Sequence, residues 1–280
     1  MKIQASPLLR ILFAAAAIGG FAAPAAAASL APHRAIYELS LVSAKSSSSV
    51  TGVDGRMLVE WKDVCDGWTL EQRFQMGIQY AEGSDIQSNT SYITWESKDG
   101  RRYRFNIRKL LNGELDEEHR GEATLMDRQP EKGSGGTVTF TQPEQKTVDL
   151  PAGTLFPTTH TVRLLEAAEA DTRFFPRVIF DGADGESATL VGAAIGKGGG
   201  TAAGVSEVNL PKQLVERPSW PVRMAFFPLE TKGPEGEVPD YEMSVRLFEN
   251  GVAGDMLIDY GDYTVRAVLK TLEGIPPAKC

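Results

Sequence analysis

The sequence predicts a mainly β protein in which about thirteen antiparallel strands form a curved, half-open barrel or β-spiral with one main helix in the middle of the chain. Short segments of alternating apolar and polar residues recur along the chain and are separated by Asp-Gly and Asn-Gly dipeptides. These dipeptides favour tight hairpins because glycine and asparagine tolerate a positive φ. A single sheet of this size must curl or close on itself.

The N-terminal residues 1–28 have the pattern of a signal peptide. Lys2 and Arg10 form a basic head, Ile11–Phe21 is an apolar run, and Ala26-Ala27-Ala28 resembles a cleavage site. The apolar run is too short to span a bilayer. We therefore expect a soluble protein exported to the periplasm, with no integral membrane segment after the signal is removed.

Residues 29–280 are expected to form a single domain with two strand-rich halves, 35–150 and 172–275, joined by a helix at 157–170. In the first half, alternation begins at Ala35. The other strands expected there are Arg56–Lys62, Trp68–Met76, Ser91–Ser97, Arg102–Lys109, Glu114–Thr124, Thr137–Thr141 and Lys146–Leu150. The Asp66-Gly67 dipeptide is expected to form the first of the hairpin turns, with a serine-rich break at Ser43–Val53 before it.

The helix is predicted from the stretch LPAGTLFPTTHTVRLLEAAEAD, where Pro157 and the two threonines after it suit a helix start. Val162, Leu165 and Ala168 give it one apolar face. After it, strands are expected at Arg173–Phe180, Ser187–Ile195, Val205–Val208, Trp220–Phe227, Tyr241–Phe248, Met256–Tyr260 and Tyr263–Thr271. Pro176, Pro221 and Pro228 indicate edge strands or bulges.

The charge of the chain argues against nucleic acid and anionic membranes as partners. Without Lys2 and Arg10, the 29 basic residues fall to 27 against 37 acidic ones, so the net charge is −10. The sequence also has no cluster of lysine and arginine. Solubility is the simplest explanation of this charge.

Cys65 and Cys280 are the two cysteines of the chain. In an oxidising compartment, two thiols without a third most simply form one disulfide, although two free thiols remain an alternative. A metal site has less support, because the cysteines and the three histidines show no ligand spacing.

No catalytic, cofactor or metal motif stands out, so we do not expect an enzyme. The glycine-rich stretch 192–204 fails the spacing of a phosphate-binding loop, and no nucleophile elbow is present. His160 is the most interesting ionisable residue: it suits a general base or a partner contact, but also a structural role at the helix entry. Aromatic residues on the strands suit core packing, and a surplus of them could line an apolar groove.

Several motifs together resemble the EipB family of periplasmic envelope-integrity proteins. They are the signal peptide, the early strand around His33-Arg34-Ala35-x-Tyr37-x-Leu39, and Leu150-Pro-x-Gly153-Thr-x-Phe156-Pro157-Thr-x-His160-Thr161 before the helix. A cysteine near the third strand paired with one at the C-terminus, and Tyr241–Tyr263 with its Asp255-x-x-x-Asp259-Tyr260 run, extend the likeness over nearly the whole mature chain.

This resemblance implies a half-open β-spiral locked by a Cys65–Cys280 disulfide, a role in envelope integrity under stress, and a periplasmic tetratricopeptide-repeat protein as partner. It implies no catalytic residue and no cofactor. Phe156, Pro157, Thr158 and His160 are the residues that we expect a partner to contact. A second hypothesis is a carrier that binds a lipid or other apolar ligand in the concave face of the sheet, and an enzyme is a distant third.

Overall fold

All the strands that the structure describes lie in one antiparallel sheet. The computed structural model describes residues 30–126, 133–183, 185, 187–199, 204–206, 209–229 and 238–280, and these contain fourteen strands and two helices. The expected signal peptide at 1–28 lies outside the described residues. The prediction of a mainly β, curved and barrel-like fold is confirmed, with fourteen strands in place of about thirteen.

The strands before the main helix are β1 (His33–Ala44), β2 (Val50–Asp63), β3 (Gly67–Tyr80), β4 (Ile86–Ser97), β5 (Arg102–Leu111), β6 (Glu114–Leu125), β7 (Ser134–Gln142) and β8 (Lys146–Pro151). The main helix is α1 (Pro157–Glu169), one residue shorter than predicted. It is followed by β9 (Phe174–Ile179), β10 (Thr189–Ile195), the short helix α2 (Lys212–Val215), β11 (Ser219–Pro228), β12 (Tyr241–Phe248), β13 (Ala253–Asp259) and β14 (Tyr263–Gly274).

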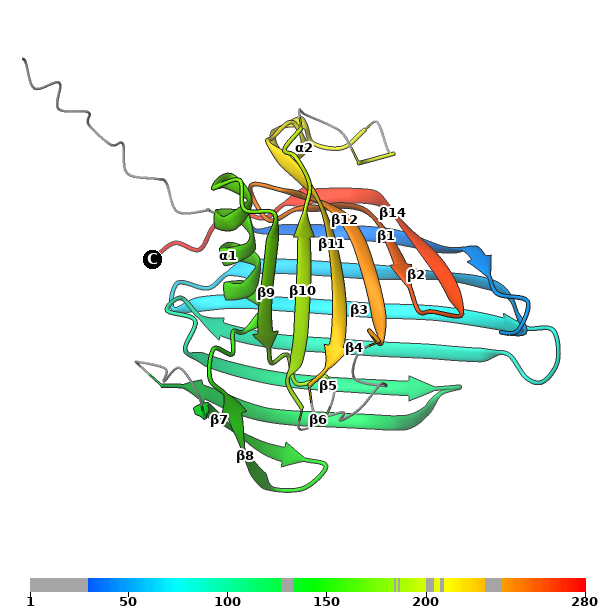
Figure 1. Ribbon diagram of the computed structural model, residues 1–280, viewed down its shortest axis with the longest axis horizontal. Coiled ribbons are helices and arrows are strands. Elements are labelled where there is room, and N and C mark those ends of the chain that lie inside the picture. Colours follow the sequence, from blue (N-terminus) through cyan, green and yellow to red (C-terminus); the bar gives the residue numbers. More distant parts are fainter. Residues whose placement is uncertain are drawn as a thin grey trace, which may run out of the picture.

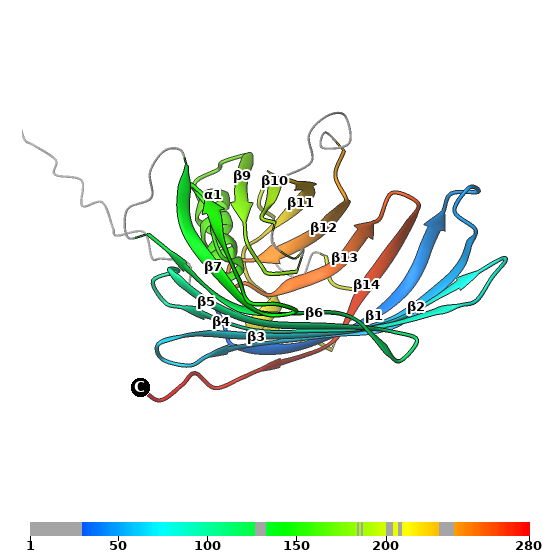
Figure 2. The same ribbon diagram turned by 90° about the horizontal axis from the view of Figure 1, so that it is seen from below.

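The sheet is a meander whose first and last strands pair with each other. The order is β8-β7-β6-β5-β4-β3-β2-β1-β14-β13-β12-β11-β10-β9. His33 on β1 faces Gly274 on β14, and the register continues to Ala44 opposite Tyr263. Figures 1 and 2 show the result, a deep trough with β9 to β12 folded over the long strands. The two free edges are therefore β8 and β9, which are neighbours in sequence and are joined through α1.

The free edge of β9 is protected by the chain that leads into α1 and by a proline. Leu155 forms a parallel bridge with β9: its N–H donates to the carbonyl of Val178 (2.9 Å), and its own carbonyl accepts from Phe180 (3.1 Å). Pro176 lies two residues before Val178 and four before Phe180, so its backbone faces the same free edge as theirs. Its missing N–H therefore removes one hydrogen-bond donor from that edge. The prediction that Pro176 marks an edge strand is confirmed.

The expectation for Pro221 is wrong, because β11 pairs on both sides. The last pair between β10 and β11 is Ile195 with Val222, and beyond it the Pro221 carbonyl still accepts from the Gly196 N–H (2.8 Å), so the missing proline N–H removes only the reciprocal bond at the end of that ladder. A proline is tolerated here because the bond it cannot make is the last of the ladder.

Two other sequence predictions need correction. No strand is assigned at Val205 or Ser206, and residues 207–208 lie outside the described part, so the strand expected at 205–208 is not found. The first hairpin joins β1 to β2, and the second, between β2 and β3, turns at Cys65, whose φ is 66°, because Gly67 already belongs to β3 and lies buried under Trp95. Strands β2, β3 and β4 are also longer than expected, since cross-strand pairing supports polar residues that break the apolar alternation.

The trough is filled by two apolar clusters. The larger cluster combines inward-facing residues of β1, β2, β9 to β14 and the apolar face of α1, where Leu164, Leu165 and Ala168 are buried. The smaller cluster lies between β5 to β8 and the chain segments on either side of α1 and β9. Its largest members are Tyr103, Phe105, Phe140, Phe156 and Phe180. Phe156, the residue just before α1, therefore belongs to this smaller cluster.

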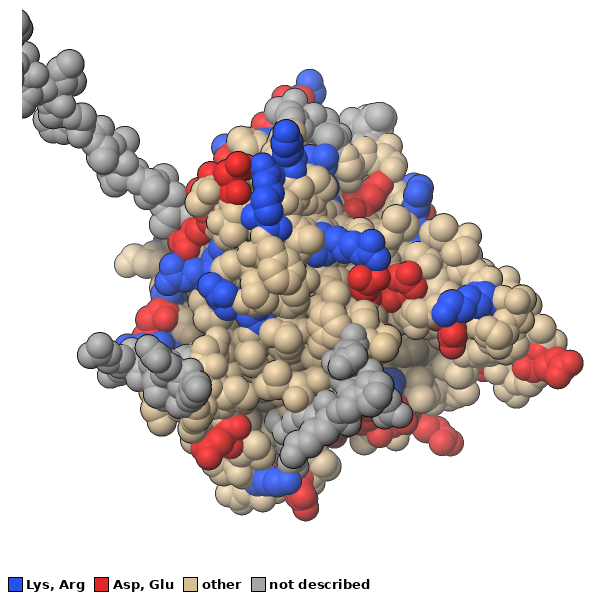
Figure 3. All heavy atoms as spheres, in the orientation of Figure 1, with Lys and Arg blue, Asp and Glu red and all other residues tan. Residues whose placement is uncertain are grey.

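The face that carries β9 to β12 is a mixed-charge surface. Figure 3 shows lysine and arginine interspersed with aspartate and glutamate on this face, with no large area of one sign.

Candidate functional site at the helix entry and the disulfide

The start of α1 is capped by a glutamate from a distant strand. The N-cap residue Phe156 makes no side-chain cap hydrogen bond. The Glu96 carboxylate of β4 instead accepts hydrogen bonds from the backbone N–H of Thr158 (2.7 Å) and of Thr159 (2.8 Å), and from the Thr159 hydroxyl. These bonds satisfy two of the N–H groups that a helix leaves unpaired at its N-terminus, and an anion there is favoured by the helix dipole.

Glu96 is a buried carboxylate, with only 2 % of its surface exposed. Burial raises its pKa, because removal from water disfavours the charged form, whereas the hydrogen bonds from Thr159 and Thr158 oppose the rise. The threonine pair, which the sequence predicts to suit the helix start, supplies the hydrogen-bond donors of the cap. The acceptor lies 62 residues earlier in the chain.

Phe156 anchors the helix entry to the second apolar cluster. Its side chain is fully buried and stacks on the Tyr103 ring, with the ring centroids 4.9 Å apart. Tyr103 pairs with Glu96 across β4 and β5 and donates its hydroxyl hydrogen to the carbonyl of Asp181 (3.1 Å). One cluster thus holds the cap, the first helical turn and the end of β9 together.

His160 lies one turn into the helix and is also buried, with 6 % of its surface exposed. Its Nε2 has no hydrogen-bond partner in the described residues, and its ring lies 5.8 Å from that of Phe175. Burial, with a smaller contribution from the positive charge of Arg177, lowers its pKa to about 4. His160 is therefore neutral at pH 7.

The residues expected to contact a partner are mostly not on the surface. Phe156, Thr158 and His160 are buried, and Pro157 is half-buried. Their side chains are not available to a partner in this conformation, because they hold α1 against the sheet. The described residues also contain no group of three or more histidine, cysteine, aspartate or glutamate side chains that could hold a metal ion.

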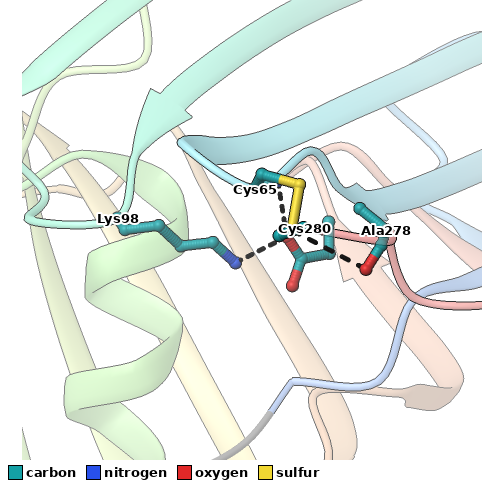
Figure 4. Close-up of a disulfide and its surroundings, with 5 residues drawn as sticks. Cys65, Lys98, Ala278 and Cys280 are labelled. Atoms are coloured by element: carbon teal, nitrogen blue, oxygen red, sulfur yellow. Dashed lines mark hydrogen bonds and ion pairs between the residues drawn. A yellow bond between two sulfur atoms is a disulfide. The ribbon is translucent and has the colours of Figure 1, made fainter.

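Cys65 and Cys280 form a disulfide, with a Cα–Cα distance of 5.7 Å and 215 residues between them in sequence. This is the pairing that the family resemblance implies. Figure 4 shows the bond between the β2–β3 turn and the C-terminal tail, with the Lys98 side chain beside it. The turn is braced by Asp63, which accepts from the Cys65 N–H (3.0 Å) and pairs with Lys98 (2.9 Å). In the sheet β1 lies between β14 and β2, so the bond ties the tail that follows β14 across β1 to the β2–β3 turn.

These features define a class of protein: a half-open antiparallel β-barrel whose two edge strands are joined in sequence by one helix and whose C-terminal tail is tied back by a long-range disulfide. No helix in the described residues is long and apolar enough to cross a membrane.

The chain belongs to the EipB-like family, whose model matches residues 24–276. It is 32% identical over 275 residues to the cell envelope integrity protein EipB of Brucella abortus (strain 2308), covering 98% of this chain and 94% of that relative. It is also similar to a crystal structure of a β-barrel-like protein of a domain of unknown function, DUF1849, from Brucella abortus. The TM-score is 0.80 and the identity 32%, over 89% of this chain and 99% of that one.

Proposed function

We propose that this protein is exported to the periplasm, where it maintains the integrity of the cell envelope under stress without catalysing a reaction. The likeness over nearly the whole chain to a relative named as a cell envelope integrity protein carries this proposal. The expected signal peptide at 1–28 supports export. The disulfide supports an oxidising compartment, because such bonds persist there.

The absence of turnover is supported by the state of the ionisable residues in the interior. His160 and His33 are buried with lowered pKa values, and Glu96 is engaged by the helix N-terminus. A general base needs to reach substrate and to exchange a proton near the working pH. These three groups are placed to support packing and capping.

The test is complementation of a deletion strain of the source organism that is challenged with detergent or a cell-wall antibiotic. The full-length gene should restore growth, and a gene without codons 2–28 should not, because its product stays inside the cell. His160→Ala should restore growth in proportion to its abundance in the periplasm. Full abundance without rescue for His160→Ala would reopen the case for catalysis, and equal rescue by the gene without the signal would refute the periplasmic role.

We further propose that the partner is a periplasmic tetratricopeptide-repeat protein, on the strength of the family resemblance. Because the helix entry is buried, the contact falls on other surfaces of the barrel. Calorimetric titration of the purified protein with each exported repeat protein of the same organism tests this. If none of them binds, the partner proposal is wrong, whereas the proposed envelope role is unaffected.

A carrier function is the second candidate, because the inner face of the trough keeps partly exposed apolar side chains. Phe74 and Met76 on β3, Met243 on β12 and Phe226 on β11 pack against the main core but are only partly buried. Native mass spectrometry of protein purified from the periplasm should detect a co-purifying apolar ligand if this function is correct. A mass that equals the bare chain in every preparation would argue against it.

A further inference from the structure

The outer face of β3 to β7 carries an open groove of about 870 Å³. A smaller hollow of about 240 Å³ adjoins it and shares Trp95, Arg104 and Glu122 with it. Figure 2 shows β3 to β6 as the floor of the trough, away from α1 and β9 to β12. On β5, Tyr103 and Phe105 pack inward and are buried, so Arg104 between them points outward. Arg104 is accordingly exposed to solvent. This groove is therefore separate from the inner face of the trough.

Three arginines at this groove have no acidic partner. Among the described residues, no carboxylate lies within salt-bridge distance of Arg102, Arg104 or Arg120, whereas Arg73 on the neighbouring part of β3 pairs with Glu71 (2.5 Å). Glu122 faces Arg104 directly across the ladder and still makes no ion pair with it. Three guanidinium groups and one carboxylate thus give a local positive charge on a protein whose mature chain is acidic.

The central guanidinium is held in place by a tryptophan. The Arg104 guanidinium carbon lies 4.2 Å from the centre of the Trp95 ring, and that of Arg102 lies 5.4 Å from it. Stacking on an aromatic ring fixes the planar group and leaves its N–H edge free to bind. Arg120 is the diagonal neighbour of Arg104 across β5 and β6, so one extended ligand can reach both.

Short polar side chains from β3, β5 and β7 complete the groove: Thr69, Asn106, Thr139 and Thr141. The Thr139 hydroxyl already shares a hydrogen bond with Thr147 (3.1 Å) and Thr141 donates to the Arg120 carbonyl (3.3 Å), so Thr141 offers a ligand its acceptor oxygen. The backbone groups of β4 to β6 are committed to neighbours on both sides, so a peptide cannot add to this surface as a strand. A ligand that brings its own hydroxyl groups matches both the arginines and the threonine and asparagine side chains, whereas an acidic peptide would use chiefly the arginines.

We propose that this groove binds an acidic oligosaccharide, a chain of sugar rings that carry carboxylate or phosphate groups. The anionic substituents bind Arg104 and Arg120, because guanidinium groups pair with carboxylate and phosphate through two parallel hydrogen bonds. The sugar hydroxyls bond to the threonine and asparagine side chains. The apolar C–H faces of the rings lie against Ile93, which is 47% exposed, and the open part of Trp95. This site is independent of the periplasmic role proposed above.

The experiment compares three probes on the purified mature protein by calorimetry and tryptophan fluorescence. They are hexagalacturonate, which is acidic, maltohexaose, which is neutral and of the same length, and inorganic phosphate. We expect saturable binding of hexagalacturonate that weakens as salt is added, and no binding of maltohexaose at the same concentration. Stronger binding of phosphate than of hexagalacturonate would overturn the proposal that the ligand is an oligosaccharide, and the groove would then be a site for small anions.

Two double variants supply the matched comparison. Arg104→Ala with Arg120→Ala removes two groove arginines, and Arg56→Ala with Arg73→Ala removes two exposed arginines that already have glutamate partners. Both lower the net charge equally. The groove variant should lose about a hundredfold in affinity, roughly tenfold for each charge-assisted contact, and the control less than about threefold. Equal losses in the two variants at unchanged melting temperature, or no binding by the wild-type protein, would refute the site.

Discussion

Glu96, the second-to-last residue of β4, accepts a hydrogen bond from the Thr159 N–H at 2.8 Å and thereby joins the end of that strand to the first turn of α1. Because α1 packs beside the edge strand β9, this contact ties that side of the molecule to β4. The helix start has no local side-chain cap, so its stability depends on this one carboxylate.

Glu96→Ala should lower the free energy of unfolding by about 1–3 kcal/mol, because one buried and one partly buried N–H group of the helix lose their acceptor. Glu96→Gln should lose less, since the amide oxygen keeps one of the two bonds. Urea unfolding at pH 7 measures both. Glu71→Gln on β3 is the control, and a surface change of this kind should stay within about 0.5 kcal/mol. If Glu96→Ala behaves like this control, the cap does not hold the helix.

His160 should make the folded protein less stable as the pH falls. Its pKa is about 4 in the folded protein against 6.5 for the free side chain, so the unfolded chain takes up a proton first as the pH falls. The contribution of about 3 kcal/mol is fully present above pH 6.5 and is lost as the pH falls toward 4. His160→Leu should therefore flatten the fall in stability between pH 6.5 and 4, measured by urea unfolding at several pH values.

Glu96 should act in the opposite direction. Its pKa is raised in the folded protein, so its contribution to stability is present below its unfolded pKa of 4.5 and is lost as the pH rises through the folded value. Glu96→Gln should consequently steepen the loss of stability on acidification, while His160→Leu reduces it. Parallel pH profiles for the two variants would contradict the assignment of both groups. His33, whose pKa is also lowered by burial, leaves a residual slope in every variant.

The sequence was sufficient for the features that local chemistry determines. Asn112 and Gly113 both have a positive φ in the structure, as the Asn-Gly hairpin signal predicts. Pro176 lies on a free edge, and the apolar spacing of Leu165 and Ala168 located the helix to within one residue. In each case the energy that selects the conformation comes from a few neighbouring residues.

The contacts that close the molecule were not predictable in this way. The pairing of Glu96 with α1 spans 62 residues, and its only signal was a helix start without a cap, because Glu96 shares its strand face with polar residues such as Thr90 and Thr94. The pairing of β1 with β14 likewise depends on the whole meander. The sequence did contain a signal for the groove arginines: Arg102 and Arg104 are two residues apart on one face of β5, and Trp95 lies on the neighbouring strand β4.

Removal of the disulfide should weaken the fold by the same amount whichever cysteine is changed. A bond that closes a loop of 215 residues contributes at most roughly 5 kcal/mol in the chain-entropy account. Cys65→Ser, Cys280→Ser and the double variant should have equal melting temperatures, because all three remove the same bond. Reductant should lower the melting temperature of the wild-type protein to that value and leave the variants unchanged. Additive losses in the double variant would show that the thiols act separately.

Phe156→Ala should separate an internal role of the helix entry from a partner contact. The ring is fully buried against Tyr103, so its removal should cost about 3–5 kcal/mol, whereas Phe174→Ala, at a ring that is 62% exposed, should change the free energy of unfolding by less than about 1 kcal/mol. Hydrogen exchange should speed up in α1 for the first variant only, because Phe156 anchors the turn that Glu96 caps. In the deletion strain, the Phe156 variant should then rescue growth in proportion to its reduced abundance. A stable, abundant Phe156→Ala protein that fails to rescue would mean instead that this ring leaves the core to meet a partner, and the helix entry would return as the contact surface.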